Sequence, residues 1–173
     1  MARKGLVKLL VVVSFATSVL CRAQTATPPA AQPPSLYLTP YGPPITLEAA
    51  KKVASAAQAE AMRNHWLMTI AVVDPAGNLV YYERTDNSQA ASSKIAIEKA
   101  RSAAIFKRPT RAFQDAMAKA GVNLRILSLD GAVPIEGGVP LLSEGKIVGA
   151  IGVSGDLSEN DAQCAKAAAQ ELK

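Results

Sequence analysis

The chain has 173 residues, 49% of them hydrophobic, and a formal net charge of +5 at pH 7. This length accommodates one domain of ordinary size. Four of the 19 basic residues and no acidic residue lie in positions 1–23, so the remainder holds 15 basic against 14 acidic residues, a net charge of +1. Because this remainder lacks the basic excess with which proteins bind nucleic-acid backbones, we expect no nucleic-acid partner.

The first 23 residues have the pattern of a secretory signal peptide. Basic residues at positions 3, 4 and 8 precede an apolar run over residues 9–20, and the small residue Ala23 follows. The apolar run is short for a membrane span. We therefore expect cleavage after Ala23 and a periplasmic or secreted protein without stable membrane insertion. An uncleaved anchor and a lipoprotein acylated at Cys21 are the alternatives.

Residues 24–45 are expected to form a Pro-rich arm or linker ahead of a domain over residues 46–173. They contain seven of the 11 prolines, and this composition does not bury enough apolar surface to fold alone. Leu36, Tyr37, Leu38 and Tyr41 are unusually apolar for a tether. They indicate packing along the domain or onto a neighbouring subunit.

The first half of the domain has the pattern of a helix, a hairpin and a second helix. Thr46 is placed to cap a helix that ends near Arg63, and its apolar residues recur at helical spacing. Strands over 69–73 and 79–84 flank a strong turn signal at 74–78. Asn87 or Ser88 is expected to cap the second helix, which runs to about Lys107.

The second half predicts a short helix ended by Gly121, a short strand near 126–129, a glycine-rich hairpin of strands 139–142 and 147–154, and a final helix. Residues 158–161 are typical of a capping box, with Asp161 as the N-terminal carboxylate of that helix. The order α-β-β-α-α-β-β-β-α predicts an α+β domain, an antiparallel sheet of about five strands with helices packed on it.

The glycine-rich hairpin is the most unusual stretch. Six of the 11 glycines lie between positions 136 and 156, and one face of the strand 147–154 consists of Val148, Ala150, Gly152 and Ser154. Glycine within a strand marks a bulge or the close approach of another backbone or a ligand. The smooth face therefore indicates tight packing against a helix or a subunit, or the seat of a ligand.

Histidine and cysteine are scarce, which limits the metal and nucleophile chemistry. His65 is the only histidine, so a multi-histidine zinc site is excluded and a Ser-His-Asp triad requires His65 itself. Cys164 is the only cysteine beyond residue 23, so no disulfide forms within the mature chain. Its Ala-rich helical surroundings favour a packed thiol, and a bond between subunits is the alternative.

Four segments, taken in their order and spacing, resemble the GlcG/HbpS family of haem-binding-like proteins, which includes the C-terminal domain of PduO-type proteins. They are IAVVDPAGNLVYYERTDN at 70–87, IEKARSAA at 97–104, EGGVPLL at 136–142 and IVGAIGVSGDLSENDAQCA at 147–165. The likeness covers roughly residues 46–173. It implies a profilin-like α/β sandwich that forms homo-oligomers and holds a small molecule in a pocket, with haem as the leading ligand and possible cofactor.

The sequence departs from the family pattern at two places near the expected pocket. Residues 85–87 read Thr-Asp-Asn where the family has Met-Asp-Gly, and Asp156 follows Gly155 where the family has a second glycine. Both departures leave the identity of the ligand open.

The resemblance also implies site residues. Lys99 matches the Lys-Ala pair of the family, and Gly137, Gly138 and Pro140 match its pocket edge. Arg84, Lys99 and Arg101 have the charge to pair with carboxylates such as haem propionates. Structural alternatives are an ion pair of Lys99 with Asp86 or Glu98 and a tight turn at the two glycines. The predicted ligand-binding residues are Arg84, Asp86, Lys99, Gly137, Gly138 and Pro140.

His65 is the candidate axial ligand of haem iron, because neutral imidazole binds iron well. The alternative for His65 is a surface or capping residue at the end of a helix. Tyr81, Tyr82 and Met117 are chemical substitutes, although such residues more often pack.

Three functions stay open. The first is binding of haem or a related planar ligand. The second is an enzyme or accessory protein for a small organic acid or aromatic catabolite, with Lys99, Arg84, Asp86 or His65 for acid–base chemistry. The third is an oligomeric assembly module with a vestigial pocket.

Overall fold

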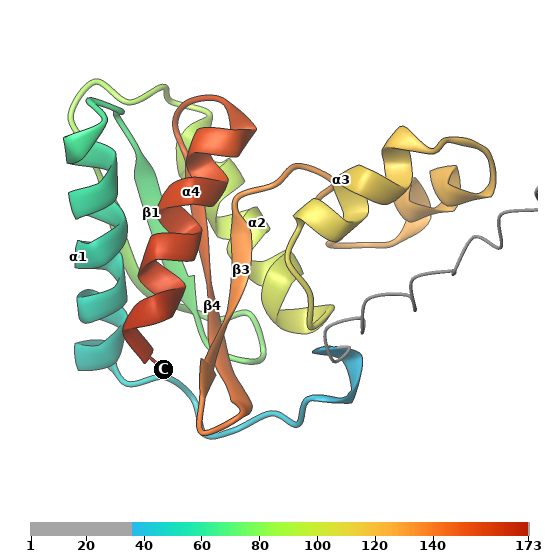
Figure 1. Cartoon of the computed structure of the whole chain (residues 1–173), viewed down its shortest axis with the longest axis horizontal. Helices are drawn as coiled ribbons and strands as arrows, with labels where there is room; N and C mark the ends of the chain where they lie inside the picture. The colour runs from blue at the N-terminus through green and yellow to red at the C-terminus, as the bar shows by residue number, and fades with distance from the viewer. Residues whose placement is uncertain (1–35, 173) are drawn as a thin grey trace, which may run out of the picture. The chain divides into compact units, whose positions relative to one another are not determined.

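The computed structural model describes residues 36–172, and its centre is a four-stranded antiparallel sheet (Figure 1). The strands are β1 (Thr69–Val73), β2 (Leu79–Arg84), β3 (Gly138–Ser143) and β4 (Lys146–Ser154), and they lie in the order β2-β1-β4-β3. The predicted signal peptide and residues 24–35 of the predicted arm lie outside the described residues. The predicted α+β class is confirmed, with both hairpins as expected.

Helices cover the sheet on both faces (Figure 1). α1 (Leu47–Arg63) and α4 (Ser158–Ala169) share one core with Ile70, Val72 and Ile151, while α2 (Ser92–Ile105) packs on Ala71, Val73 and Ala150. Neighbouring residues of a strand face opposite sides of a sheet, so β1 serves both cores. Among the described helices, none is both long and apolar enough to cross a bilayer.

The face of the sheet under α2 is built from very small residues. A Cβ added to Gly152 would lie 2.0 Å from the carbonyl oxygen of Ala96 and 2.5 Å from the backbone nitrogen of Ala100. Only glycine allows the helix backbone this close to β4. This part of the smooth face is therefore the seat of the chain's own helix, which confirms the packing interpretation and leaves no room there for a ligand or a subunit.

The described end of the arm packs along the domain. β4 extends beyond Val73, the last residue of β1, and the arm continues the pairing there: the Ile147 N–H donates to Pro40 O at 3.0 Å, and the Gly42 N–H donates to Ile147 O at 2.8 Å. The hydroxyl of Tyr41 donates to Ala104 O at 3.0 Å, near the end of α2. Tyr37 belongs to a short 3₁₀ turn, η1 (Leu36–Leu38), that precedes these anchors.

The prediction of a fifth strand is wrong. Residues 126–129 do not pair with the sheet; most of them belong to a 3₁₀ helix, η2 (Gly121–Ser128), that follows α3 (Arg111–Ala118). Only Ile126 of η2 is buried. A short apolar run does not distinguish a strand from a helical turn, which explains the error. In Figure 1, α3 extends away from the sheet on the side of β3.

Two predicted helix caps are also wrong. α2 begins at Ser92 and has no side-chain cap, because Asn87 has a φ of 62° and the Ser88 hydroxyl lies 3.3 Å from that of Thr69. The capping box does not form at the start of α4, where Leu157 is the cap residue and provides no side-chain bond. By contrast, the Thr46 hydroxyl accepts the N–H of Ala49 as predicted for α1.

Candidate functional site

A cleft of about 380 Å³ lies beside α3, between this helix, η2 and the arm. Pockets that hold small molecules in proteins range from roughly 300 to 1,000 Å³. Six of the ten lining residues are apolar or aromatic, and none is acidic. The lining residues are Tyr37, Arg108, Ala112, Phe113, Ala116, Asn123, Arg125, Ile126, Ser128 and Leu129.

Arg108 packs against two aromatic rings in this cleft. Its guanidinium carbon lies 4.0 Å from the ring centre of Tyr37 and 4.9 Å from that of Phe113. The Nε–H donates to Phe106 O at 3.0 Å, and the ring of Phe106 meets that of Phe113 edge-on at 5.2 Å. Burial lowers the pKa of Arg108. The guanidinium is thus held flat and partly dehydrated at the wall of the cleft.

The arm holds Tyr37 against the cleft through contacts on its C-terminal side. Lys107 donates to Thr39 O at 2.9 Å, and its ammonium lies 4.2 Å from the ring centre of Tyr41. Pro109 and the short α3 then place Arg108 and Phe113 on either side of the turn that enters α3. One wall of the cleft therefore comes from the arm and the other from the domain.

A second group of residues forms a buried charge cluster where α2, α4 and the start of β3 meet. The Lys99 ammonium donates to Asp161 Oδ2 at 2.6 Å and to Val153 O at 3.2 Å. Lys99 is 1% exposed and Asp161 is 2% exposed. Burial raises the pKa of the Asp161 carboxyl, and the Lys99 ammonium opposes that rise. The expected alternative partners, Asp86 and Glu98, do not pair with Lys99.

Gly137 and Gly138 lie against this ion pair. A Cβ on Gly137 would lie 2.9 Å from Lys99 Nζ, and one on Gly138 would lie 2.3 Å from Lys99 O. Gly138 also exchanges two hydrogen bonds with Thr110, whose hydroxyl accepts the Gly138 N–H at 2.9 Å. Pro140 is buried in β3 opposite Ala150. The structure thus gives both glycines a packing reason, and their role in ligand binding stays a prediction.

Glu136 extends the cluster towards the surface. Its side chain is 1% exposed, and Oε1 accepts a hydrogen bond from Arg111 at 3.1 Å. The backbone N–H of Glu136 donates to Gln114 Oε1 at 2.8 Å. Within the described part of the chain, Oε2 of Glu136 has no hydrogen-bond partner. These contacts join α3 to the beginning of β3.

The remaining predicted ligand residues lie at the other edge of the sheet. Arg84 and Asp86 are exposed, and Arg84 pairs with Thr69 on β1 at the end of β2. Since β2 and β3 are three strand spacings apart, this edge is roughly 14 Å from the Gly138 edge. The structure therefore does not bring Arg84 and Asp86 together with Lys99.

The candidate iron ligands are scattered. His65 is exposed just after α1, with a φ of 58° and its backbone N–H bonded to Met62 O. The Tyr81 hydroxyl donates to Glu83 and that of Tyr82 to Ser93, each at 2.9 Å. None of these residues lines the cleft beside α3, and neither does Met117. In residues 36–172, no group of three or more His, Cys, Asp or Glu is arranged to hold a metal.

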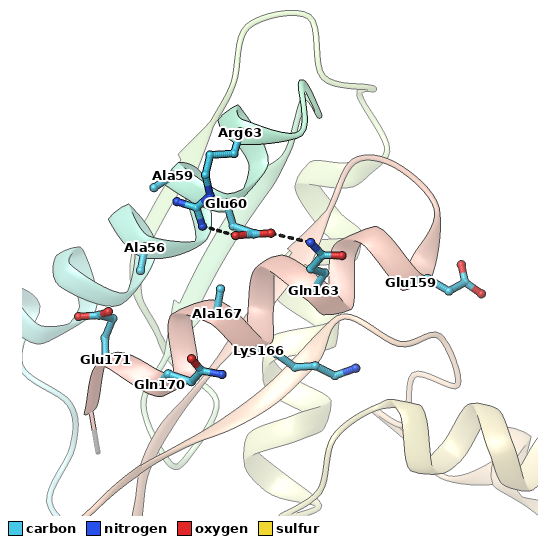
Figure 2. Close-up of a pocket in the computed structure, with 10 residues that line it drawn as sticks. All are labelled: Ala56, Ala59, Glu60, Arg63, Glu159, Gln163, Lys166, Ala167, Gln170 and Glu171. Atoms are coloured by element: carbon cyan, nitrogen blue, oxygen red, sulfur yellow. Dashed lines mark hydrogen bonds and ion pairs between the residues drawn. The ribbon is translucent and has the colours of Figure 1, made fainter.

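A larger groove of about 690 Å³ lies on the outer side of α1 and α4 (Figure 2). Figure 2 shows Glu60 at its centre, bonded to Arg63 on α1 and to Gln163 on α4. The bond from Gln163 and the pairing with Arg63 lower the pKa of Glu60. The lining holds charges of both signs, alanines and no aromatic ring. It suits a planar apolar ligand less well than the cleft beside α3.

The residues that define the cleft were not predicted from the sequence. Tyr37 was predicted only to pack along the domain or onto a neighbouring subunit, and Phe113, Arg108 and Arg125 were not among the predicted site residues. The available signal was weak: an arginine before Pro109 and an aromatic residue in a Pro-rich segment. Their meeting depends on the path of the arm, which local patterns do not reveal.

Comparisons with known proteins identify the relatives of this chain. A family model described as haem degrading protein HbpS-like matches residues 45–170. GlcG of Escherichia coli K12 is 37% identical over 110 residues, 64% of this chain and 81% of GlcG. The solved double mutant of HbpS from Streptomyces reticuli is 32% identical with a TM-score of 0.69, covering 87% of this chain and 99% of HbpS.

Protein ORFY of Klebsiella pneumoniae has a similar structure. Its TM-score is 0.71 at 28% identity, and the match covers 76% of this chain and 92% of ORFY. The agreement of the family model, the GlcG sequence and these structures confirms the resemblance predicted from the sequence. The chain belongs to the GlcG/HbpS-like family.

Proposed function

We propose that the protein is exported and binds haem or a related planar ligand in the cleft beside α3. The cleft itself carries the proposal, because it combines a suitable volume with the aromatic rings of Tyr37 and Phe113. Aromatic rings stack well on planar ligands. The description of the matching family, which names haem degradation, supports haem as the ligand.

The lining residues fit the chemistry of haem. Ala112, Ala116 and Ile126 provide apolar contact for a macrocycle, and the arginines suit its carboxylates. A tyrosine oxygen is a known type of ligand for haem iron, and Tyr37 is the residue in the lining that offers one. Haem bound there would supply iron redox chemistry, and the chain's own residues would hold and orient it.

An absorbance titration with haem tests the proposal. We expect saturable one-to-one binding, because the cleft has room for a single planar ligand. Ala116→Trp fills the cleft and should abolish binding, whereas Ala118→Trp, on an exposed position of the same helix, should leave it unchanged. Uptake that never saturates, or equal binding by both variants, would contradict the proposal.

The iron ligand is tested separately in the same titration. Tyr37→Phe keeps the ring and removes the oxygen, and His65→Ala removes the imidazole. If Tyr37 binds the iron, only the first variant should shift the haem absorption bands. A shift in His65→Ala alone would instead support the exposed histidine as the axial ligand.

Degradation of the bound haem is a second candidate function, favoured by the description of the matching family. With a reductant and oxygen present, we expect the haem absorption of the complex to decay with time. The decay should slow in Ala116→Trp if the cleft holds the haem that is degraded. Stable absorbance would leave binding as the function.

The proposal includes self-association. Large apolar side chains gather in and after η2 and remain exposed: Val122, Leu124, Leu127, Leu129 and Ile135. Patches of this kind mark interaction surfaces in soluble proteins. Light scattering should show an oligomer that dissociates in Leu127→Ser; a monomeric wild-type protein would contradict this part.

A further inference from the structure

The cleft beside α3 carries a positive charge that the described part of the chain does not neutralise. Arg63, Arg101 and Arg111 each form an ion pair with a carboxylate. Arg108 and Arg125, which both line the cleft, have no carboxylate partner among the described residues, and no acidic residue lines the cleft. Two arginines therefore line one cavity without a carboxylate counter-charge in its lining.

Arg108 is held in a geometry that suits an anion. Its Nε–H already donates to Phe106 O, and the rings of Tyr37 and Phe113 both pack against the guanidinium. The terminal Nη groups are left as the donors available to a ligand. Burial lowers the pKa of this guanidinium because it removes water from the charged group. A ligand anion would offset that loss of hydration. A held guanidinium also loses little freedom on binding.

Arg125 provides the second charge from a different element. It lies in the last turn of η2 and is exposed, while its backbone carbonyl accepts the Ser128 hydroxyl at 2.7 Å. Because Arg108 precedes α3 and Arg125 follows it, the two arginines line the cleft from separate parts of the chain. A ligand with two anionic groups would engage both.

We propose that the cleft selects its planar ligand by charge, with Arg108 and Arg125 binding two carboxylates and Tyr37 of the arm forming the wall over the ring. This inference rests on the proposed function, since it assigns a ligand class to the same cleft. The class is a planar dicarboxylate, and iron is not required for its recognition. The arm is then part of the site, because Tyr37 both lines the cleft and packs against Arg108.

Fluorescence titration of the purified protein with mesoporphyrin IX and its dimethyl ester, in the same detergent, tests the charge. The two molecules share the ring and lack iron, and only the first is a dianion. We expect the diacid to bind at least about tenfold more tightly, since a charge-assisted hydrogen bond contributes roughly 1.5–3 kcal/mol. Equal affinity of both molecules would overturn the charge inference and leave the binding proposal standing.

Variants then identify the residues. Arg125→Gln and Arg108→Gln should each weaken diacid binding about tenfold and leave the ester unaffected, whereas Lys119→Gln, an exposed cation just after α3, should change neither. If Arg125→Gln and Arg108→Gln change the affinity for the diacid no more than Lys119→Gln does, the assignment of the two arginines is overturned. Because Arg125 is exposed, its variant tests the proposal even if Arg108→Gln fails to fold.

The contribution of the arm is tested with Tyr37→Ala and Tyr37→Phe. We expect Tyr37→Ala to weaken binding of both porphyrins, while Tyr37→Phe, which keeps the ring, retains it. Leu38→Ala is the control, since Leu38 is 88% exposed and does not line the cleft. Unchanged binding in Tyr37→Ala would remove the arm from the site. Failure of wild-type protein to bind either porphyrin or haem would instead overturn the proposed function itself.

Discussion

Removing the charge of Lys99 should strongly destabilise the domain. The Lys99 ammonium is the cationic partner of Asp161 at 2.6 Å, and both side chains are almost completely buried. In Lys99→Met the side chain keeps much of its apolar bulk, while the Asp161 carboxylate loses its partner. The variant thus isolates the electrostatic part of the interaction.

The size of the expected destabilisation follows from the burial of Lys99 and Asp161. Breaking a buried ion pair by removing one partner typically costs about 3–5 kcal/mol, because the other charge stays buried without compensation. Domains of this size have a free energy of unfolding of roughly 5–15 kcal/mol, so the expected loss is a large part of the total stability. Replacing both residues, in Lys99→Met with Asp161→Leu, should recover much of the loss, because apolar pairs of similar volume often substitute for buried ion pairs.

Urea unfolding followed by the fluorescence of Trp66, the only tryptophan, measures these differences. Lys94→Met is the matched control, because Lys94 is an exposed lysine on the same helix, and its variant should change the free energy of unfolding by less than about 0.5 kcal/mol. If Lys99→Met is no less stable than Lys94→Met, the ion pair does not stabilise the fold. A stable Lys99→Met that loses ligand would favour the binding role predicted from the sequence.

Three further predictions concern other parts of the chain. Gly152→Ala should lower the free energy of unfolding by about 1–3 kcal/mol, because its Cβ would meet the backbone of α2; an unchanged urea midpoint would contradict that packing. Burial raises the pKa of Cys164 to about 12, so a thiol reagent should react only after unfolding, and this thiol's contribution to stability should be complete below about pH 9 and fall as pH rises towards 12. Rapid labelling of the native protein would refute its burial. Expressed with its leader in a bacterium, the protein should be recovered from the periplasm with Gln24 as its first residue; a mass that includes the leader would contradict cleavage.

The order of most elements followed from local patterns. Strand-like runs on either side of the turn at 74–78 predicted β1, β2 and the first hairpin, and helical spacing predicted α1. The strand expected at 126–129 failed because a short apolar run does not distinguish a strand from a helical turn, and these residues lie mostly in η2. The predicted cap at Ser158 failed because α4 already begins at this residue, while Asp161 accepts the Asp156 N–H and pairs with Lys99, a residue 62 positions earlier.

The candidate site was only partly accessible from the sequence. The resemblance singled out Lys99, Gly137 and Gly138, and the structure brings these three together in one buried cluster. It did not single out the cleft, because Tyr37, Arg108 and Arg125 come from three separate segments. Their proximity arises from the arm pairing with the end of β4, a tertiary contact that has no local pattern.

A structure of the protein bound to haem tests the central claim most directly. We predict a planar ring in the cleft beside α3, flanked by Tyr37 and Ala116, with its carboxylates at Arg108 and Arg125. Haem seated elsewhere, whether against Lys99 and Gly137 or at His65 with the cleft empty, would contradict the account.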